Sequence, residues 1–156
     1  MSKIKFAVLG CGHIGKRHAS MILGNDDFEL VALCDVKPKE ELGLDKFSGI
    51  RFFNSIDGLI QSGIEIDAVA IATPNGCHQE QALQVLENNW HVVLEKPMAL
   101  TKAGCEKIIF KALQKQQQVF CVMQNRYSPP SVWLKDVFDS GKLGKVFMVQ
   151  INCYWN

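Results

Sequence analysis

The sequence has little of what marks nucleic-acid-binding or membrane-spanning proteins. Its 17 Lys and Arg residues nearly balance its 16 Asp and Glu residues, and the formal net charge is only +1. Such a balance gives no bulk attraction for nucleic acid or an anionic membrane. No apolar run approaches the roughly 20 residues that span a bilayer, and the first residues show no signal-peptide pattern. We therefore expect no nucleic-acid partner, no membrane association and a cytoplasmic location.

The sequence also lacks the cysteine spacing of a zinc site or a disulfide framework. None of its six cysteines forms a C-x-x-C pair, and several lie inside apolar runs. This usage is typical of small buried residues in a reducing compartment, so we expect neither disulfides nor a bound metal. Cys11 is of separate interest because it lies in a glycine-rich turn, where chemical modification would block a bound ligand.

That glycine-rich turn is the most informative motif. Gly10, Gly12 and Gly15 are spaced G-x-G-x-x-G between an apolar run at 4–9 and a helical pattern, and Asp35 follows twenty residues after the last glycine. The glycines permit a tight turn, close approach of backbone to phosphate, and close packing of helix on strand. The helix N-terminus supplies free N–H groups for an anion, and the carboxylate suits a ribose hydroxyl. The motif predicts a dinucleotide site.

Short apolar runs alternate with helical stretches along the first 125 residues. This alternation predicts an α/β fold, a doubly wound parallel Rossmann sheet with helices on both faces. The helix at 79–88 is expected to bury Ala82, Val85 and Leu86, and the helix at 102–117 to bury the four residues that share its apolar side: Ile108, Ile109, Ala112 and Leu113. The expected strands are 4–9, 30–34, 51–53, 68–72, 91–94 and 119–123.

The pattern changes after residue 125. A helix that opens at Ser128-Pro129-Pro130 is expected to bury Trp133, Leu134, Val137 and Phe138, and apolar residues alternate from Val146 to the end as in a half-buried strand. We predict a dinucleotide-binding domain over 1–125. Residues 126–156 would form a connecting helix and the first strand of a truncated second α/β domain.

Polar groups follow three of the predicted strands. Ala72-Thr73-Pro74-Asn75 ends the fourth, with His78 three residues on. Glu95-Lys96-Pro97 ends the fifth and Gln124-Asn125-Arg126 the sixth. Ligands bind at the carboxyl ends of the strands in such sheets. A lysine there could exchange a proton with an alcohol as a hydride moves to or from a nicotinamide. The alternative is that these residues form only a salt bridge at the strand end, which needs no ligand.

Together these motifs resemble the Gfo/Idh/MocA family of sugar and inositol oxidoreductases. The matching segments are G-C-G-H-I-G-K-R-H-A at 10–19, Asp35, A-T-P-N-G-C-H at 72–78, E-K-P at 95–97, N-R-Y-S-P at 125–129 and G-K-L-G-K-V at 141–146. The resemblance covers essentially the whole chain. It implies an NAD(P)-dependent enzyme with a Rossmann domain and a second α/β domain, which forms homo-oligomers when full length.

The resemblance also implies roles for individual residues. Backbone N–H groups of Gly12, His13 and Ile14 would meet the pyrophosphate, and Asp35 would hold the adenosine ribose. Lys96 would be the acid/base beside the nicotinamide. The other residues expected at the cofactor are Gly10, Gly15, Thr73, Pro74, Asn75, His78, Glu95, Asn125 and Arg126. His78 could equally orient backbone near the cofactor. The family's second-domain catalytic histidine has no counterpart to assign in this sequence.

Asp35 sets the expected cofactor. Its carboxylate accepts hydrogen bonds from a 2′-hydroxyl and repels a 2′-phosphate, so NAD is expected over NADP, with Lys37 and Lys39 close enough to soften the preference. The substrate would be a small sugar, nucleotide sugar or polyol whose hydroxyl is oxidised. The ending Q-I-N-C-Y-W-N is similar to UDP-N-acetylglucosaminuronate 3-dehydrogenases of this family. The alternative function is a non-catalytic NAD(P)-binding sensor, from which Lys96 would distinguish the enzyme.

Overall fold

The structure is a computed structural model that describes residues 2–152 and 154. The chain forms two compact units, Met1–Val122 and Met123–Asn156. In the described part of the chain, no helix is long and apolar enough to cross a membrane.

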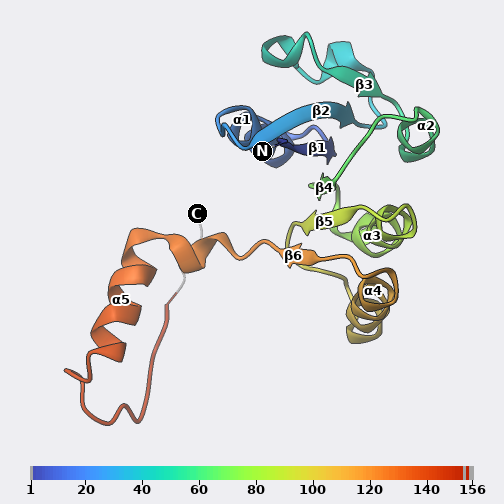
Figure 1. Ribbon diagram of the computed structural model, residues 1–156. Coiled ribbons are helices and arrows are strands. Elements are labelled where there is room, and N and C mark those ends of the chain that lie inside the picture. The colour runs from blue at the N-terminus through green and yellow to red at the C-terminus, as the bar shows by residue number, and fades with distance from the viewer. Residues whose placement is uncertain (1, 153, 155–156) are drawn as a thin grey trace. The chain divides into compact units, whose positions relative to one another are not determined.

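The first unit is built on one six-stranded sheet in which all neighbouring strands pair in parallel. The strand order is β3-β2-β1-β4-β5-β6, visible in Figure 1 from β3 to β6. The strands are β1 (Ile4–Leu9), β2 (Phe28–Cys34), β3 (Arg51–Phe53), β4 (Ala68–Ile71), β5 (His91–Leu94) and β6 (Val119–Cys121). The order reverses between β1 and β4, and ligands of open α/β sheets bind at such a switch point.

Helices cover both faces of this sheet. The helix α1 (His13–Leu23) lies on one face, and α2 (Ile56–Gln61), α3 (His78–Glu87) and α4 (Lys102–Lys115) lie on the other (Figure 1). Each face has its own buried core. One joins β-strand residues to Leu59, Val85 and Ile108 of α2, α3 and α4. The other joins them to Ala19 and Ile22 of α1 and to the loop after β2. The doubly wound Rossmann fold is confirmed.

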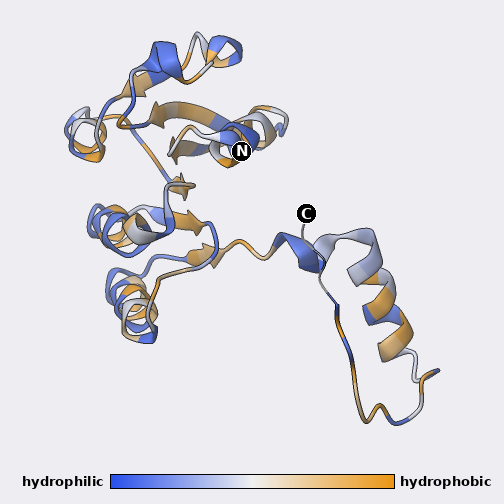
Figure 2. Ribbon diagram, turned by 180° about the vertical axis from the view of Figure 1, so that it is seen from behind, coloured by the Kyte–Doolittle hydropathy of each residue, from blue (hydrophilic) through white to orange (hydrophobic). Residues whose placement is uncertain are grey.

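The strands of this sheet are mainly apolar, whereas the helices carry polar residues on their outer sides (Figure 2). All four residues of β4 are buried because both faces of this central strand are covered. The expected face of α3 is also buried. On α4, however, Ile108 and Ala112 are buried while Ile109 and Leu113 are 48% and 74% exposed. The apolar residues of α4 therefore extend beyond the side of the helix that packs against the core.

Three short elements in the loops of this unit were not expected from the pattern. Helix α2 begins after Ser55, whose hydroxyl accepts a hydrogen bond from the Gly58 N–H at 3.0 Å. The loop after β2 contains the 3₁₀ turns Lys39–Glu41 and Asp45–Phe47, and Phe47 is buried in the core on the α1 side. These segments are too short for a helical period to be recognised in the sequence.

The second unit contains the 3₁₀ turn η4 (Gln124–Tyr127) and the helix α5 (Pro129–Asp139). The helix is where the sequence predicts it, with Pro129 in its first turn. Its expected buried face is not buried, since Trp133, Leu134 and Phe138 are 66%, 52% and 58% exposed. A helix buries its apolar face only against a partner, and the described chain supplies none there.

The strand expected from Val146 onward is absent from residues 146–152, which have no regular secondary structure and are exposed. A β-strand requires hydrogen bonds to a neighbour, and alternation alone cannot supply them. Cys153, Trp155 and Asn156, which belong to the same expected strand, lie outside the described residues. The assignment of 126–156 to a second, substrate-binding domain stays a prediction.

Candidate functional site

The glycine turn after β1 packs against two neighbours so closely that side chains do not fit. Gly10 has φ of +88°, and a Cβ on it would lie 2.7 Å from the carbonyl oxygen of Ala72. A Cβ on Gly15 would lie 1.7 Å from the Gly10 carbonyl oxygen. Gly10 is therefore required by backbone conformation and by contact with the β4 loop, and Gly15 by the packing of α1 on the turn.

Gly12 differs, because a Cβ on it would meet no atom within 4 Å and its φ of −68° suits any residue. Gly12 is the N-cap of α1 and provides no side-chain cap. The first N–H to bond back along the helix is that of Lys16, to the Gly12 carbonyl at 3.0 Å. The N–H groups of His13 and Ile14 thus face outward at the positive end of the helix, beside open space that suits an anion.

Asp35, directly after β2, is tied to the glycine turn. Its Oδ2 accepts a hydrogen bond from the Cys11 N–H at 2.7 Å, and its Oδ1 accepts one from the Lys37 N–H at 2.9 Å. Each carboxylate oxygen has a second lone pair, so the side chain can still accept bonds from a ribose diol. The sequence motif suggests that Asp35 binds a ribose. It does not reveal that Asp35 also holds the glycine turn.

The thiols of Cys11 and Cys34 lie beneath this carboxylate. Both residues are about 1% exposed, and Cys11 Sγ lies 3.6 Å from the Cys34 carbonyl oxygen. Burial, followed by the charge of Asp35, raises the pKa of the Cys11 thiol to about 12. Burial likewise raises the pKa of Cys34 to about 12, with contributions from Cys11 and Asp35. Cys11 is therefore shielded from chemical modification in the folded chain, as expected for a small buried residue.

The loop after β4 carries the exposed residues Pro74 and Asn75 beside the partly buried Thr73. The Thr73 hydroxyl bonds to Gln81 Oε1 of α3 at 2.5 Å. His78 is completely buried at the start of α3. Its Nδ1 lies 2.7 Å from the Pro97 carbonyl oxygen and its Nε2 lies 2.9 Å from that of Thr73. Both ring nitrogens are therefore occupied by the protein, and of the two roles considered for His78 the geometry favours orienting backbone.

The loop after β5 presents Glu95 inward and Lys96 outward. Glu95 Oε1 lies 2.9 Å from Nε2 of His18 on α1, and the two side chains are only 14% and 20% exposed. Lys96 is exposed. Among the described residues it has no hydrogen-bond or ion-pair partner, so its amine is available to a ligand.

The contact of His18 with Glu95 was not predicted from the sequence. The position of His18 in the sequence does contain a signal. His18 follows Gly15 by three residues and precedes Ile22 by four, which places it on the helix face that packs on the sheet. A histidine on that face reaches the carboxyl edge of the sheet, where it can meet an acid from another loop.

The structure thus brings the loops after β1, β2, β4 and β5 to one edge of the sheet, with the expected cofactor residues from Gly10 to Lys96 among them. Asn125 and Arg126 belong to the other unit, where they lie in η4 and are exposed. Their place in the same site stays a prediction.

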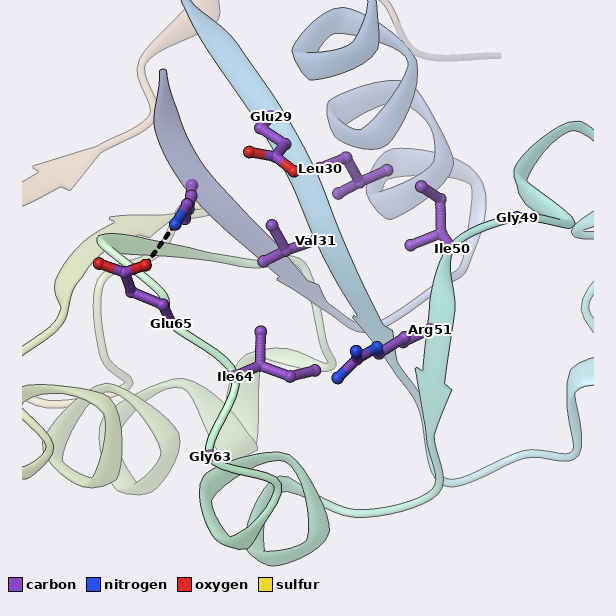
Figure 3. A pocket seen from close by; sticks show the side chains of 10 residues that line it. Glu29, Leu30, Val31, Gly49, Ile50, Arg51, Gly63, Ile64 and Glu65 are labelled. Atoms are coloured by element: carbon purple, nitrogen blue, oxygen red, sulfur yellow. Dashed lines mark hydrogen bonds and ion pairs between the residues drawn. The ribbon is translucent and has the colours of Figure 1, made fainter. Parts of the chain in front are cut away.

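A hollow of about 500 Å³ lies at the opposite edge, where the strands begin (Figure 3). Leu30, Arg51 and Ile64 line it, and Lys5 and Glu65 form an ion pair across its side. None of the residues expected at the cofactor lines this hollow. The order of the sheet and the free helix N-terminus favour the carboxyl edge as the functional site.

Comparison with known proteins finds a family that matches most of the chain. The model of the GFO_IDH_MocA family, described as an oxidoreductase family with an NAD-binding Rossmann fold, matches residues 4–124. The chain is 32% identical over 151 residues to inositol 2-dehydrogenase of Salmonella typhimurium, covering 94% of this chain and 44% of that protein. It is 29% identical to glucose-6-phosphate 3-dehydrogenase of Bacillus subtilis, covering 95% and 41% of the two.

Solved structures give the same picture. The WlbA dehydrogenase of Bordetella pertussis, in complex with NADH and UDP-GlcNAcA, aligns with a TM-score of 0.85 and 33% identity over 93% of this chain and 44% of that one. A scyllo-inositol dehydrogenase of Lactobacillus casei with bound NAD(H) and scyllo-inositol aligns with a TM-score of 0.82 and 29% identity, over 92% and 43%. The chain spans less than half the length of these relatives.

Proposed function

Because the chain belongs to the Gfo/Idh/MocA family of oxidoreductases with an NAD-binding Rossmann fold, we propose that it is the cofactor-binding part of an NAD-dependent dehydrogenase. Its substrate is a sugar, nucleotide sugar or polyol, in which a hydroxyl and a ketone are interconverted. The observation that carries the proposal is the N-terminus of α1 at Gly12, which has no side-chain cap, on the same edge of the sheet as the exposed amine of Lys96.

The residues at this edge suit a dinucleotide. The N–H groups of His13 and Ile14 bind the pyrophosphate over Gly12, where a side chain would intrude. Asp35 binds the adenosine ribose and disfavours the 2′-phosphate of NADP. The turn from Thr73 to Asn75 flanks the nicotinamide end. Asn125 and Arg126 are proposed to contact the cofactor as well.

Lys96 performs the proton transfer in this proposal. Bound NAD supplies a nicotinamide that accepts or returns a hydride. The Lys96 amine takes the hydroxyl proton as the alcohol is oxidised, and returns it when the ketone is reduced. A protein that only senses NAD has no need of an amine there, which is why the catalytic function is preferred.

The full-length protein is further proposed to act in the cytoplasm and to form homo-oligomers. The five described cysteines are free, as suits a reducing compartment. Among the candidate substrates, support for a nucleotide sugar comes from the WlbA complex and support for a polyol from the inositol dehydrogenases. To distinguish the two classes, the full-length protein is first loaded with NAD. It is then titrated with UDP-GlcNAcA and, in a separate experiment, with inositol.

Two matched glycine substitutions test the cofactor site. Gly12→Val adds a side chain at the N-terminus of α1, and Gly49→Val adds one in the hollow at the opposite edge of the sheet. At both positions the added Cβ has no protein atom within 4 Å, so each substitution would displace only a bound ligand. Calorimetric titration with NAD should show that Gly12→Val weakens binding at least about tenfold while Gly49→Val leaves it unchanged. Equal affinities in all three proteins would refute the proposed site.

A further inference from the structure

His78 is the only polar or charged side chain that is fully buried in the described part of the chain. It is the first residue of α3, and its ring lies between two loops. Nδ1 is 2.7 Å from the Pro97 carbonyl oxygen, and Nε2 is 2.9 Å from the Thr73 carbonyl oxygen. The ring therefore joins the loop after β4 to the loop after β5.

The chemistry of these two contacts restricts the ring. A carbonyl oxygen only accepts hydrogen bonds, and a neutral imidazole has one N–H donor. With a neutral ring, one nitrogen lone pair would face a carbonyl oxygen at hydrogen-bond distance in a place that water does not reach. A buried polar contact of that kind is unfavourable. Both contacts are hydrogen bonds only if each ring nitrogen carries a proton. Such a ring is a cation, which is costly to bury alone, and the two charge-assisted hydrogen bonds to carbonyl oxygens offset that cost.

The loops that His78 joins belong to the proposed cofactor site. Thr73 precedes the exposed residues Pro74 and Asn75, and Pro97 follows Lys96 directly. Each loop is also held from a second side. The Thr73 hydroxyl bonds to Gln81, and Ala99, two residues after Pro97, is 9% exposed and belongs to the core. His78 thus fixes the spacing between two anchored segments.

We propose that His78 is a positioning residue that, as a doubly protonated ring, holds the Lys96 loop against the turn after β4. Thr73 is also the neighbour of the glycine turn, since a Cβ on Gly10 would lie 2.9 Å from Thr73 Cγ2. The clamp therefore extends from the pyrophosphate end of the site to the amine of Lys96. The relevance of this contact to catalysis rests on the proposed function, whereas the protonation state of the His78 ring does not depend on that function.

The first test observes the ring directly in the unmodified chain. Two-dimensional ¹H–¹⁵N spectroscopy at neutral pH, with the His78 ring assigned through its own Cβ and Cα, reports whether each nitrogen carries a proton. We expect both His78 nitrogens to be protonated. An unprotonated nitrogen at either position would overturn the proposal. The measurement needs no NAD, so failure of the proposed function leaves its result intact.

The second test asks whether the ring positions the loops. His78→Gln cannot bridge both carbonyl groups as the ring does, because its two donors share one nitrogen. His91→Gln serves as a control, because His91 lies at the start of β5, at the opposite edge of the sheet, and accepts from the Gln118 N–H. The N–H groups of Cys77 and Glu95, which bond to the Pro74 and Ile71 carbonyl oxygens, should exchange at least about tenfold faster in His78→Gln only. Unchanged exchange, or the same change in the control, would overturn the positioning role.

If His78→Gln does not fold, the ring N–H protons of the unmodified chain decide the question. Slow exchange of both protons with water supports a ring held at both ends, and rapid exchange of either overturns it.

Discussion

Glu95 Oε1 lies 2.9 Å from Nε2 of His18, and this contact joins the helix of the glycine turn to the loop that carries Lys96. The two residues are 77 positions apart in the sequence. They follow the strands β1 and β5, which are separated in the sheet by β4. A single side-chain pair therefore spans the switch point at which the dinucleotide is proposed to bind.

We expect His18 and Glu95 to stabilise each other. In a double-mutant cycle of His18→Ala and Glu95→Ala, the coupling in the free energy of unfolding should be about 1 kcal/mol or more, because both side chains are largely buried. The exposed pair Lys102–Glu106 is the control and should show no measurable coupling. Equal coupling in the two pairs, measured by urea denaturation, would show that the His18–Glu95 contact contributes nothing special.

We expect Lys96 to be needed for turnover and not for NAD binding. In the full-length protein, Lys96→Ala should lower kcat by about 10²- to 10⁴-fold, as the loss of a general acid/base does. The dissociation constant for NAD should remain nearly unchanged. Lys102→Ala, at the exposed start of α4, should leave both quantities unaltered. Undiminished turnover in Lys96→Ala would remove the assigned acid/base.

We expect Asp35 to determine the preference for NAD. Asp35→Asn keeps one acceptor oxygen but loses the charge. Its NH₂ group also takes the place of one of the two oxygens that accept hydrogen bonds from the Cys11 and Lys37 N–H groups. NAD affinity should fall about tenfold while NADP affinity falls less or rises. Fluorescence titration with both reduced cofactors measures the ratio. The assignment is wrong if the unmodified protein binds NADP as tightly as NAD.

We expect Cys11 to resist alkylation and Cys77 to react. Burial and Asp35 raise the pKa of Cys11 to about 12, so almost no thiolate is present at pH 8. Cys77 is exposed at the N-cap of α3. Mass spectrometry after iodoacetamide treatment of the folded chain should find the label on Cys77 before Cys11. Rapid labelling of Cys11 would show that the turn opens readily.

The same two buried thiols make the folded chain less stable at alkaline pH. The pKa of Cys11 and of Cys34 is raised from 9.0 to about 12, so the unfolded chain releases these protons above pH 9 while the folded chain keeps them. Stability present below pH 9 is lost as the pH rises toward 12, by about 1 kcal/mol per thiol at pH 10. Urea denaturation at pH 8 and pH 10 should show a smaller loss in a Cys11→Ala, Cys34→Ala variant.

The sequence predicted the Rossmann sheet well because each central strand is short, apolar and bounded by a turn or a helix. The starts of β1, β3, β4, β5 and β6 agree with the structure, since each of these strands is a short and mainly apolar run. The predictions failed where an apolar pattern needs a partner to become structure. Leu113 on α4, Trp133 on α5 and the apolar residues among 146–152 follow apolar patterns, yet they are exposed.

The sequence by itself determined the glycine turn, Asp35 after the second strand and Lys96 after the fifth strand. These features depend only on local spacing and on the order of the strands. The sequence could not determine how the loops are fixed to one another. Only the tertiary structure brought His18 to Glu95, the Cys11 N–H to Asp35, and His78 between Thr73 and Pro97. Such contacts join residues from separate strands, and their geometry follows from the packing of helices on the sheet, which no local pattern records.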